Sequence, residues 1–383
     1  MTRHRFRCAD ARSLGFLADS SVHLAVTSPP YPMIAMWDRL FTQLDPEIGV
    51  LLAAGSGREA HERMNRLLDP VWGELYRVLV PGGFACINIG DAARTIAGTF
   101  QLYSNHARVL RRALDLGFQS LPHILWRKQT NAPTKFMGSG MLPAGAYVTL
   151  EHEYILILRK PGKRLFAGGA DRMRRRRSAL FWEERNTWYS DLWEMKGIRQ
   201  PMPRPAGGLG PLFVDDDRPD APGTRERSGS FPFELAYRLV SMFSVAGDLV
   251  LDPFLGTGTT SLAAMAAARD SVGLDLDAVL LDRARERLSR EGLELNGYLE
   301  GRLDRHREFV GRRAAAAPGE PSRQPPLADG SPGSKLLSFR HRNRRYGFPV
   351  MTAQETDLEI SLIDRIEADG GGDVVVYYRE TSV

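Results

Sequence analysis

Short apolar runs along the chain alternate with segments in which apolar residues recur at every third or fourth position. The apolar runs predict strands, namely Phe6–Ala9, Val22–Val26, Phe84–Ile89, Ser120–Trp126, Tyr154–Leu158, Leu249–Leu251 and Ser271–Leu274. The periodic segments predict helices, namely Ala11–Leu17, His61–Leu79, Tyr103–Leu116, Pro232–Phe243 and Ala278–Glu291. Because strand and helix alternate, we expect an α/β fold with a doubly wound, mostly parallel sheet.

The alternation is interrupted by residues 163–228, which are rich in Arg, Pro and Gly and contain no long periodic segment. After the α/β pattern resumes, Ala314–Ser334 has the composition of a linker. A tail follows with one helical pattern, Leu358–Ile366, and one predicted strand, Val374–Tyr378. The predicted organisation is therefore a catalytic half (1–162), an inserted recognition region (163–228), a cofactor-binding half (229–300), a helix end with linker (301–334) and a small appendage (335–383).

The second predicted strand, Val22–Val26, ends in Thr27 followed by Ser28, Pro29, Pro30 and Tyr31. Proline has no backbone N–H and fixes its own φ, so the chain must leave the sheet at this point. The exit presents a hydroxyl, free carbonyl groups and an aromatic ring within four residues. This set suits a flat ligand that carries an amine, although an ordinary exit from a strand has the same pattern.

A glycine-rich loop, Asp252–Thr260, lies between a predicted strand and an Ala-rich helix. Its glycines let the backbone approach a ligand, and we expect Thr259 or Thr260 to cap the helix that follows. A phosphate-binding P-loop would need a Gly-Lys-Ser/Thr sequence, which is missing, and a dinucleotide-binding loop would need a third glycine where Ser261 stands. The next strand ends at Asp275, the position at which such folds place an acid against ribose hydroxyls.

Charge and composition narrow the class of partner. The 51 Lys and Arg residues exceed the 46 Asp and Glu residues, giving a formal charge of +5. Arginine predominates among the cations, which fits nucleic-acid recognition but also a G+C-rich coding sequence. We expect a cytoplasmic protein, associated with the nucleoid through DNA, because no apolar run is long enough to span a bilayer and the N-terminus lacks a signal-peptide pattern.

The joint order of the two motifs adds a resemblance. Ser28-Pro29-Pro30-Tyr31 lies upstream, the Arg-rich insert follows, and the pattern Phe-x-Gly-x-Gly beginning at Phe254 lies downstream. The chain thus resembles the permuted (beta) amino DNA methyltransferases, which have a Rossmann-like fold and use S-adenosylmethionine. The resemblance covers residues 6–160 and 229–292 and does not reach the tail.

The resemblance implies roles for individual residues. The implied catalytic residues are Ser28, Pro29, Pro30 and Tyr31. The implied cofactor-binding residues are Asp10 at the adenine, Asp275 at the ribose, Asp252, Phe254, Gly256, Thr257, Gly258 and Thr259 in the loop, and Phe231 at the methionine end. The implied DNA-binding residues are Lys135, Arg172, Arg174, Arg175, Arg176 and Arg177. No metal is expected, since Cys8 and Cys86 form no metal-binding pattern and His152 stands without a second histidine nearby.

The resemblance also implies the reaction. Serine at the first motif position is typical of family members that methylate the N4 amine of cytosine, whereas Asp or Asn is typical of adenine-N6 enzymes; methylation of adenine N6 stays open. Ring-carbon methylation needs a nucleophilic Cys, usually in a Pro-Cys pair, which the chain lacks. A nicotinamide-dependent dehydrogenase and a non-catalytic DNA-binding protein with a decayed methyltransferase fold also stay open. The implied partners are double-stranded DNA, a second copy of the chain in a homodimer, and a cognate restriction endonuclease.

Overall fold

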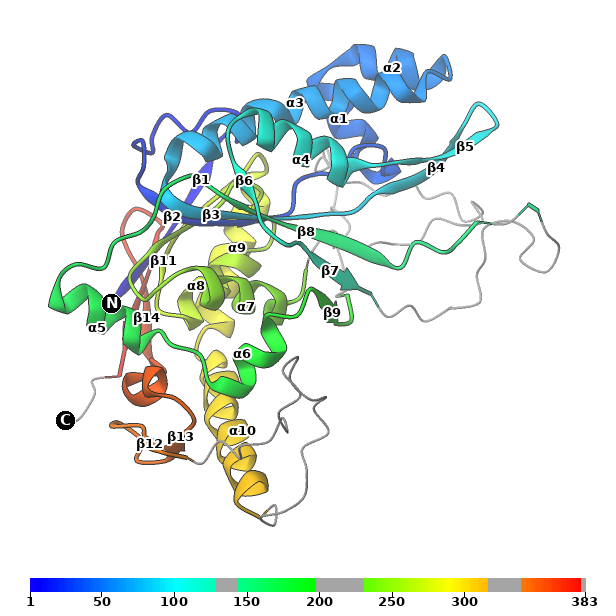
Figure 1. Ribbon diagram of the computed structural model, residues 1–383. Coiled ribbons are helices and arrows are strands. Elements are labelled where there is room, and N and C mark those ends of the chain that lie inside the picture. Colours follow the sequence, from blue (N-terminus) through cyan, green and yellow to red (C-terminus); the bar gives the residue numbers. More distant parts are fainter. Residues whose placement is uncertain (129–143, 146, 198–230, 316–338, 380–383) are drawn as a thin grey trace.

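The computed structural model describes residues 1–128, 144–145, 147–197, 231–315 and 339–379 (Figure 1). Within these ranges one mixed sheet runs through the centre of the molecule. Its strands are β1 (Thr2–Cys8), β2 (Val22–Thr27), β3 (Leu79–Ile89), β6 (Gln119–Ser120), β7 (Ile124–Arg127), β8 (His152–Arg159), β9 (Leu192–Glu194), β10 (Leu249–Asp252), β11 (Asp270–Asp275), β14 (Ile363–Ala368) and β15 (Val374–Tyr378).

The strand order is β14-β15-β1-β11-β10-β2-β3-β8-β7-β9, with β6 paired to β8. The central strands β1, β11, β10, β2 and β3 are all parallel to their neighbours in this group. Antiparallel strands extend the sheet at both sides, β15 beside β1 and β8 beside β3. This arrangement confirms the predicted α/β class. The chain order reverses between β10 and β2, which is where open α/β sheets bind their ligands.

Helices cover both faces of the sheet, with α3 and α4 on one face and α7 and α8 on the other (Figure 1). The helices are α1 (Asp38–Leu44), α2 (Pro46–Ala53), α3 (Gly57–Val78), α4 (Asn105–Asp115), α5 (Gly169–Arg177), α6 (Trp182–Trp188), α7 (Phe233–Phe243), α8 (Thr259–Ala266), α9 (Ala278–Glu291) and α10 (Leu295–Ala315). A hairpin of β4 (Ala92–Ile96) and β5 (Thr99–Tyr103), a small pair of β12 (His341–Arg342) and β13 (Pro349–Val350), and the 3-10 turns Ala35–Trp37 and Ala353–Asp357 complete the described elements. None of these helices is both long and apolar enough to cross a membrane.

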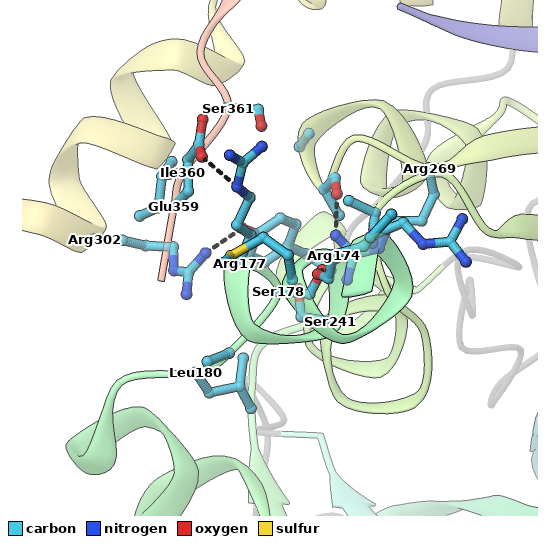
Figure 2. Close-up of a pocket in the computed structure, with 17 residues that line it drawn as sticks. Arg174, Arg177, Ser178, Leu180, Ser241, Arg269, Arg302, Glu359, Ile360 and Ser361 are labelled. Carbon is cyan, nitrogen blue, oxygen red and sulfur yellow. Dashed lines mark hydrogen bonds and ion pairs between the residues drawn. The ribbon is translucent and has the colours of Figure 1, made fainter. Parts of the chain in front are cut away.

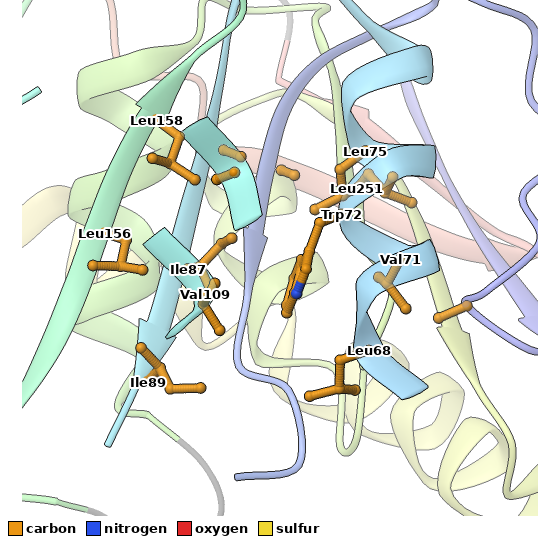
Figure 3. Packing of buried hydrophobic residues seen from close by; sticks show 14 of the residues in the cluster. Leu68, Val71, Trp72, Leu75, Ile87, Ile89, Val109, Leu156, Leu158 and Leu251 are labelled. Atoms are coloured by element: carbon orange, nitrogen blue, oxygen red, sulfur yellow. The ribbon is translucent and has the colours of Figure 1, made fainter. Parts of the chain in front are cut away.

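The three- and four-residue spacing of α3 turns one apolar stripe onto the sheet (Figure 3). Trp72 is 1% exposed and lies in the same buried cluster as Ile87 of β3 and Leu156 of β8. Fully burying a side chain of this size contributes about 2–3 kcal/mol. This packing holds β2 and β3 rigidly beside each other, so the residues that follow these strands have fixed positions.

The predicted helix over Ala11–Leu17 is wrong, because this segment forms turns. Side chains of α3 take the hydrogen bonds that a helix would have used. Glu74 accepts from the Leu14 backbone N–H at 2.6 Å, and Arg77 donates to the carbonyl groups of Leu14 and Leu17, both at 2.9 Å. With those groups satisfied, seven residues have no reason to close a helical turn.

The predicted helix over Leu358–Ile366 is also wrong, since Ile363–Ala368 is strand β14. It forms a hairpin with β15 around Asp369 and Gly372, whose φ is 83°. The turn sequence Asp-Gly-Gly-Gly-Asp at 369–373 is a hairpin signal that the apolar spacing obscured. Because β15 pairs with β1, the tail covers an edge of the main sheet that would otherwise expose unpaired backbone groups.

Two further elements differ from the pattern-based prediction. The strand expected over Ser120–Trp126 is split into β6 and β7, and Leu121 between them donates to the Ile157 carbonyl. The start of the expected linker region is helical, since α10 continues to Ala315. Its buried Arg302 and His306 contact the 163–197 segment through Glu184 and Glu183. Polar side chains on its packed face explain why apolar periodicity did not predict this helix.

Candidate functional site

Parallel strands present their carboxyl ends at the same edge of the sheet, and the motif residues gather at this edge. Asp10 follows β1, Asp275 ends β11, Asp252 ends β10 and Ser28 follows β2. These four strands are adjacent in the sheet, so the structure brings together residues that are far apart in sequence. The edge includes the reversal of chain order between β10 and β2, the position expected for a ligand.

A buried carboxylate joins the two motifs. The Thr27 hydroxyl donates to Asp252 Oδ1 and the Thr260 hydroxyl donates to Asp252 Oδ2, both at 2.6 Å. The backbone N–H of Phe254 donates to Oδ1 at 3.1 Å. Burial raises the pKa of Asp252 to about 6, against an opposing effect of the two hydroxyl donors. Asp252 thus locks the start of the glycine loop to the strand that carries the Ser28 motif.

The glycines of the loop are needed for its backbone. Gly256 has a φ of 52° and Gly258 a φ of 82°, conformations that residues with a Cβ adopt at a cost. Gly258 itself is the N-cap of α8, and no side chain caps this helix. The prediction that Thr259 or Thr260 caps α8 is therefore wrong, because Thr260 is turned inward to Asp252.

The remaining loop residues are held from α9. Arg287 donates to the Thr257 hydroxyl at 3.3 Å and to the Thr259 hydroxyl at 3.1 Å. Gly258 packs so closely on this helix that an added Cβ would lie 3.0 Å from Ala284 Cβ. The loop is thus fixed on both sides, by Asp252 and by α9, before any ligand binds.

Two more acids lie beside the loop. Asp275 accepts from the backbone N–H of Gly256 at 2.9 Å and from that of Asp277 at 3.0 Å, and burial raises its pKa. Asp10 lies close by, since Ala9 before it donates its backbone N–H to the Asp275 carbonyl at 3.2 Å. The guanidinium of Arg12 hydrogen-bonds the Asp10 carboxylate and lowers its pKa.

These residues fit a nucleoside-bearing cofactor. A Cβ added to Gly256 would meet no heavy atom within 4 Å, so this side of the loop is open to a ligand. Each carboxylate oxygen of Asp275 accepts one backbone N–H and keeps a lone pair for a ribose hydroxyl. Phe231 is 6% exposed and belongs to the buried cluster that includes Leu24 and Val26 of β2.

The Ser28 motif is tied into a polar network. Ser28 Oγ and Tyr31 Oη are 2.9 Å apart, and Tyr31 donates to Glu153 Oε2 at 2.9 Å. Asn88 Nδ2 donates to Tyr31 Oη at 2.7 Å and to Glu153 Oε2 at 2.8 Å. Lys128 forms an ion pair with the other oxygen of Glu153. The motif hydroxyl is therefore positioned by three side chains from other strands.

The backbone after the prolines is also fixed. Pro29 and Pro30 are buried, and Met33 has a φ of 65°. Asn105, at the start of α4, donates to the carbonyl groups of Pro32 at 3.0 Å and Gly90 at 2.9 Å. This bridge joins the loop of the motif to the end of β3, which holds the motif close to the sheet edge.

Sequence reasoning did not identify Asn88, Lys128, Glu153 or Asn105 as site residues. Asn88 and Glu153 are only 3% and 4% exposed. The available signal was a polar residue within an apolar strand pattern: Asn88 lies between Ile87 and Ile89. A buried polar side chain needs a partner, so such a position is informative even when no motif contains it.

The predicted DNA-binding arginines are not brought to this edge. They lie on α5, whose C-terminal Ser178 accepts from the Ala246 backbone N–H just before β10 begins. This is the amino end of the central strands, the opposite edge of the sheet from Ser28. Their contact with DNA phosphates stays a prediction, and it would take place away from the motif. Lys135 and residues 198–228 of the predicted recognition region lie outside the described residues.

A cavity of about 490 Å³ lies beside α5 (Figure 2). Its lining includes Arg174, Arg177, Arg269 and Arg302, together with Glu359 from the tail. Most of these cations have partners: Arg177 pairs with Glu359 at 3.4 Å, and Arg302 pairs with Glu184. No residue of the two motifs lines this cavity within the described ranges. The largest basic cluster of the sequence thus has a structural environment distinct from the motif edge.

Comparison with known proteins agrees with the geometry. The profile of the DNA methylase family of N6 and N4 methyltransferases matches residues 22–286. The type II methyltransferase M.MthZI of Methanothermobacter thermautotrophicus is 43% identical over 362 residues, which cover 94% of this chain and 90% of that protein. The type II methyltransferase M.MjaI of Methanocaldococcus jannaschii is 44% identical over 310 residues, covering 77% and 95%.

A solved structure is similar as well. The DNA modification methylase TTHA0409 of Thermus thermophilus, complexed with S-adenosyl-L-methionine, is 32% identical with a TM-score of 0.56, covering 75% of this chain and 94% of that one. The predicted cofactor, S-adenosylmethionine, is thereby confirmed. With both motifs at one sheet edge and a matching profile over most of the chain, the protein belongs to the N6/N4 DNA methylase family.

Proposed function

We propose that this protein is a type II restriction-modification methyltransferase of the permuted (beta) arrangement, which transfers a methyl group from S-adenosylmethionine to the N4 amine of a flipped cytosine in duplex DNA. The observation that carries the proposal is the Ser28 hydroxyl, one residue beyond the Thr27–Asp252 hydrogen bond that joins the motif to the cofactor loop. The acceptor site and the cofactor loop are thus held next to each other.

The proposal assigns the cofactor to the open side of the glycine loop, with Asp275 at the ribose and Asp10 at the adenine. When bound, S-adenosylmethionine supplies an electrophilic methyl group. The protein's own contribution is to hold the target amine in line with that group, and orientation of two reactants accounts for a large part of the rate in such reactions.

An exocyclic amine is a poor nucleophile because its lone pair is delocalised into the ring. The Ser28 hydroxyl and the Pro29 carbonyl accept its two N–H groups, which favours a pyramidal nitrogen with its lone pair directed outward. The Tyr31 ring stacks on the base, which must leave the duplex to reach the site. The proton released after transfer leaves to water, so a neutral hydroxyl suffices where other members carry a carboxylate.

Double-stranded DNA then approaches the carboxyl edge of the sheet. A homodimer and a restriction endonuclease of the same specificity are parts of the proposal that follow from the resemblance. M.MthZI and M.MjaI are both described as type II methyltransferases. This description supports a companion endonuclease, because methyltransferases of that type protect the sites that such an endonuclease cuts.

The deciding experiment is a nucleoside digest of DNA treated with the protein and S-adenosylmethionine, resolved by mass spectrometry. N4-methylcytosine is the expected product. N6-methyladenine without N4-methylcytosine would instead assign the chain to the adenine-specific enzymes. Calorimetric binding of S-adenosylmethionine, measured on the same preparation, separates an active enzyme from a DNA-binding protein that has lost its cofactor site.

A further inference from the structure

We propose that Glu153, together with Asn88 and Lys128, is a positioning residue that fixes the direction of the hydrogen bonds at the motif, so that Ser28 presents only lone pairs to the substrate amine. The inference rests on the proposed function and deepens it, because it names the residues that make a serine hydroxyl an obligatory acceptor. The carrying observation is a chain of contacts across four neighbouring strands.

The four strands β2, β3, β8 and β7 are consecutive in the sheet. Ser28 follows β2, Asn88 lies near the end of β3, Glu153 lies at the start of antiparallel β8, and Lys128 follows β7. Because β8 runs antiparallel to β3, its amino end lies at the same edge as the carboxyl ends of the parallel strands. The sheet itself therefore places the whole network beside the motif.

The direction of the network follows from counting protons. Lys128 is ion-paired with Glu153, so the carboxylate only accepts hydrogen bonds. Tyr31 has a single hydroxyl proton, and it donates this proton to Glu153 Oε2 at 2.9 Å. The Tyr31 oxygen must then accept from its other two neighbours, Asn88 Nδ2 at 2.7 Å and Ser28 Oγ at 2.9 Å.

Ser28 thus donates its only proton inward to Tyr31. The lone pairs of Ser28 Oγ are left for the amine, whose N–H groups need acceptors. If the direction were reversed, Ser28 would present a proton to an N–H group, and two donors would face each other. Glu153 determines this direction although it is two hydrogen bonds away from the substrate.

Two packing features support a selected orientation. Asn88 Oδ1 is buried and has no hydrogen-bond partner among the described residues. Leaving a buried acceptor unpaired costs about 1–3 kcal/mol, so the amide is held with its Nδ2 toward Tyr31 and Glu153 against a penalty. In addition, a Cβ added to Gly90 would lie 2.9 Å from Tyr31 Cε2 and 3.2 Å from Glu153 Cγ. Glycine at this position admits the close approach of these two side chains.

The test compares Glu153→Gln with a rescue variant. Glutamine keeps the size of the side chain but brings an amide donor in place of the acceptor-only group. We expect its single-turnover methylation rate to fall about 10–100-fold, while the Kd of S-adenosylmethionine stays within about twofold of the wild-type value. The double variant Asn88→Asp with Glu153→Gln returns an acceptor-only carboxylate to Tyr31 and should regain most of the rate.

Glu151→Gln is the matched control, because Glu151 lies two residues away, pairs with Arg127 and does not contact the network. A purely structural role for Glu153 predicts a lower melting temperature and no rescue by the double variant. An unchanged methylation rate in Glu153→Gln would overturn the proposal.

A second readout does not depend on methylation. In protein with ¹³C-labelled tyrosine, the Cζ signal of Tyr31 is identified by its loss in Tyr31→Phe. We expect this signal to shift in Glu153→Gln, to return toward its wild-type position in the double variant, and to stay unchanged in Glu151→Gln. A signal that does not shift contradicts the proposed hydrogen-bond direction, even if the wild-type protein methylates no DNA and the proposed function fails.

Discussion

The two edges of the central sheet differ in how their charged side chains are used. At the carboxyl edge, Asp275 accepts only backbone N–H groups and borders an open glycine loop. At the amino edge, cations are abundant, but Arg164 pairs with Asp248 at 2.6 Å and Arg302 with Glu184 at 2.6 Å. The edge with fewer charges thus has free capacity for a ligand, and the edge with many charges is largely neutralised from within.

The comparison shows that the density of arginine in the sequence is a poor guide to the edge that carries the motifs. Arg176 and Arg177 point to Asp357 and Glu359 of the tail, which the sequence separates from them by more than 170 residues. Exposed pairs of this kind contribute about 0–1 kcal/mol each. Their role is consistent with docking the tail onto the 163–197 segment, since the backbone of Arg177 also accepts from Glu359 N–H at 3.0 Å.

The largest effect is expected at the carboxyl edge, for Ser28→Ala. Removing the hydroxyl removes one of two acceptors for the amine, and we expect the single-turnover methylation rate to fall about 10²–10³-fold. Binding of S-adenosylmethionine, measured by calorimetry, should change less than twofold, because Ser28 belongs to the acceptor side of the site. Loss of cofactor binding would break the division between acceptor and cofactor residues on which the comparison depends.

A smaller effect is expected for the pH dependence of stability, through Asp252. Its pKa is raised from an ordinary value of 3.8 to about 6 in the folded protein. A raised carboxyl pKa means that the folded state binds the proton more tightly. The resulting stability is present at low pH and is lost as the pH rises through about 6.

Between pH 5 and pH 8, the wild-type free energy of unfolding should fall by about 1–2 kcal/mol more than that of Asp252→Asn. Urea denaturation of both proteins at the two pH values measures this difference. Asp282→Asn, at an exposed position on α9, is a suitable control, since it should follow the wild-type curve. An equal pH dependence in wild type and Asp252→Asn would contradict burial as the cause of the shift.

The smallest effect is expected at the amino edge, for the double variant of Arg176→Gln and Arg177→Gln. These side chains pair with the tail and lie at the edge opposite Ser28, so we expect DNA affinity within about twofold of the wild type. The slope of log affinity against log salt concentration should also be unchanged. A slope reduced by about 1 per arginine would show that these residues contact phosphates, as the sequence predicts.

Much of the fold could be predicted from apolar spacing. The helix over Ala278–Glu291 has the predicted bounds, and Leu249–Leu251 and Ser271–Leu274 lie within β10 and β11. Such segments are predictable because their burial pattern repeats with the period of the element. The segments Ala11–Leu17 and Leu358–Ile366 were predicted wrongly because their backbone groups are satisfied by distant partners, α3 in one case and β15 in the other.

The sequence by itself determined the two motifs, their order and the acids that end β1, β10 and β11, because local chemistry and strand ends are written in consecutive residues. Only the tertiary structure decided which charges meet. It placed Asn88, Lys128 and Glu153 around Tyr31, and it placed the arginines of α5 at the opposite edge. The physical reason is that strand order and direction, which the sequence does not state, decide which side chains share an edge of the sheet.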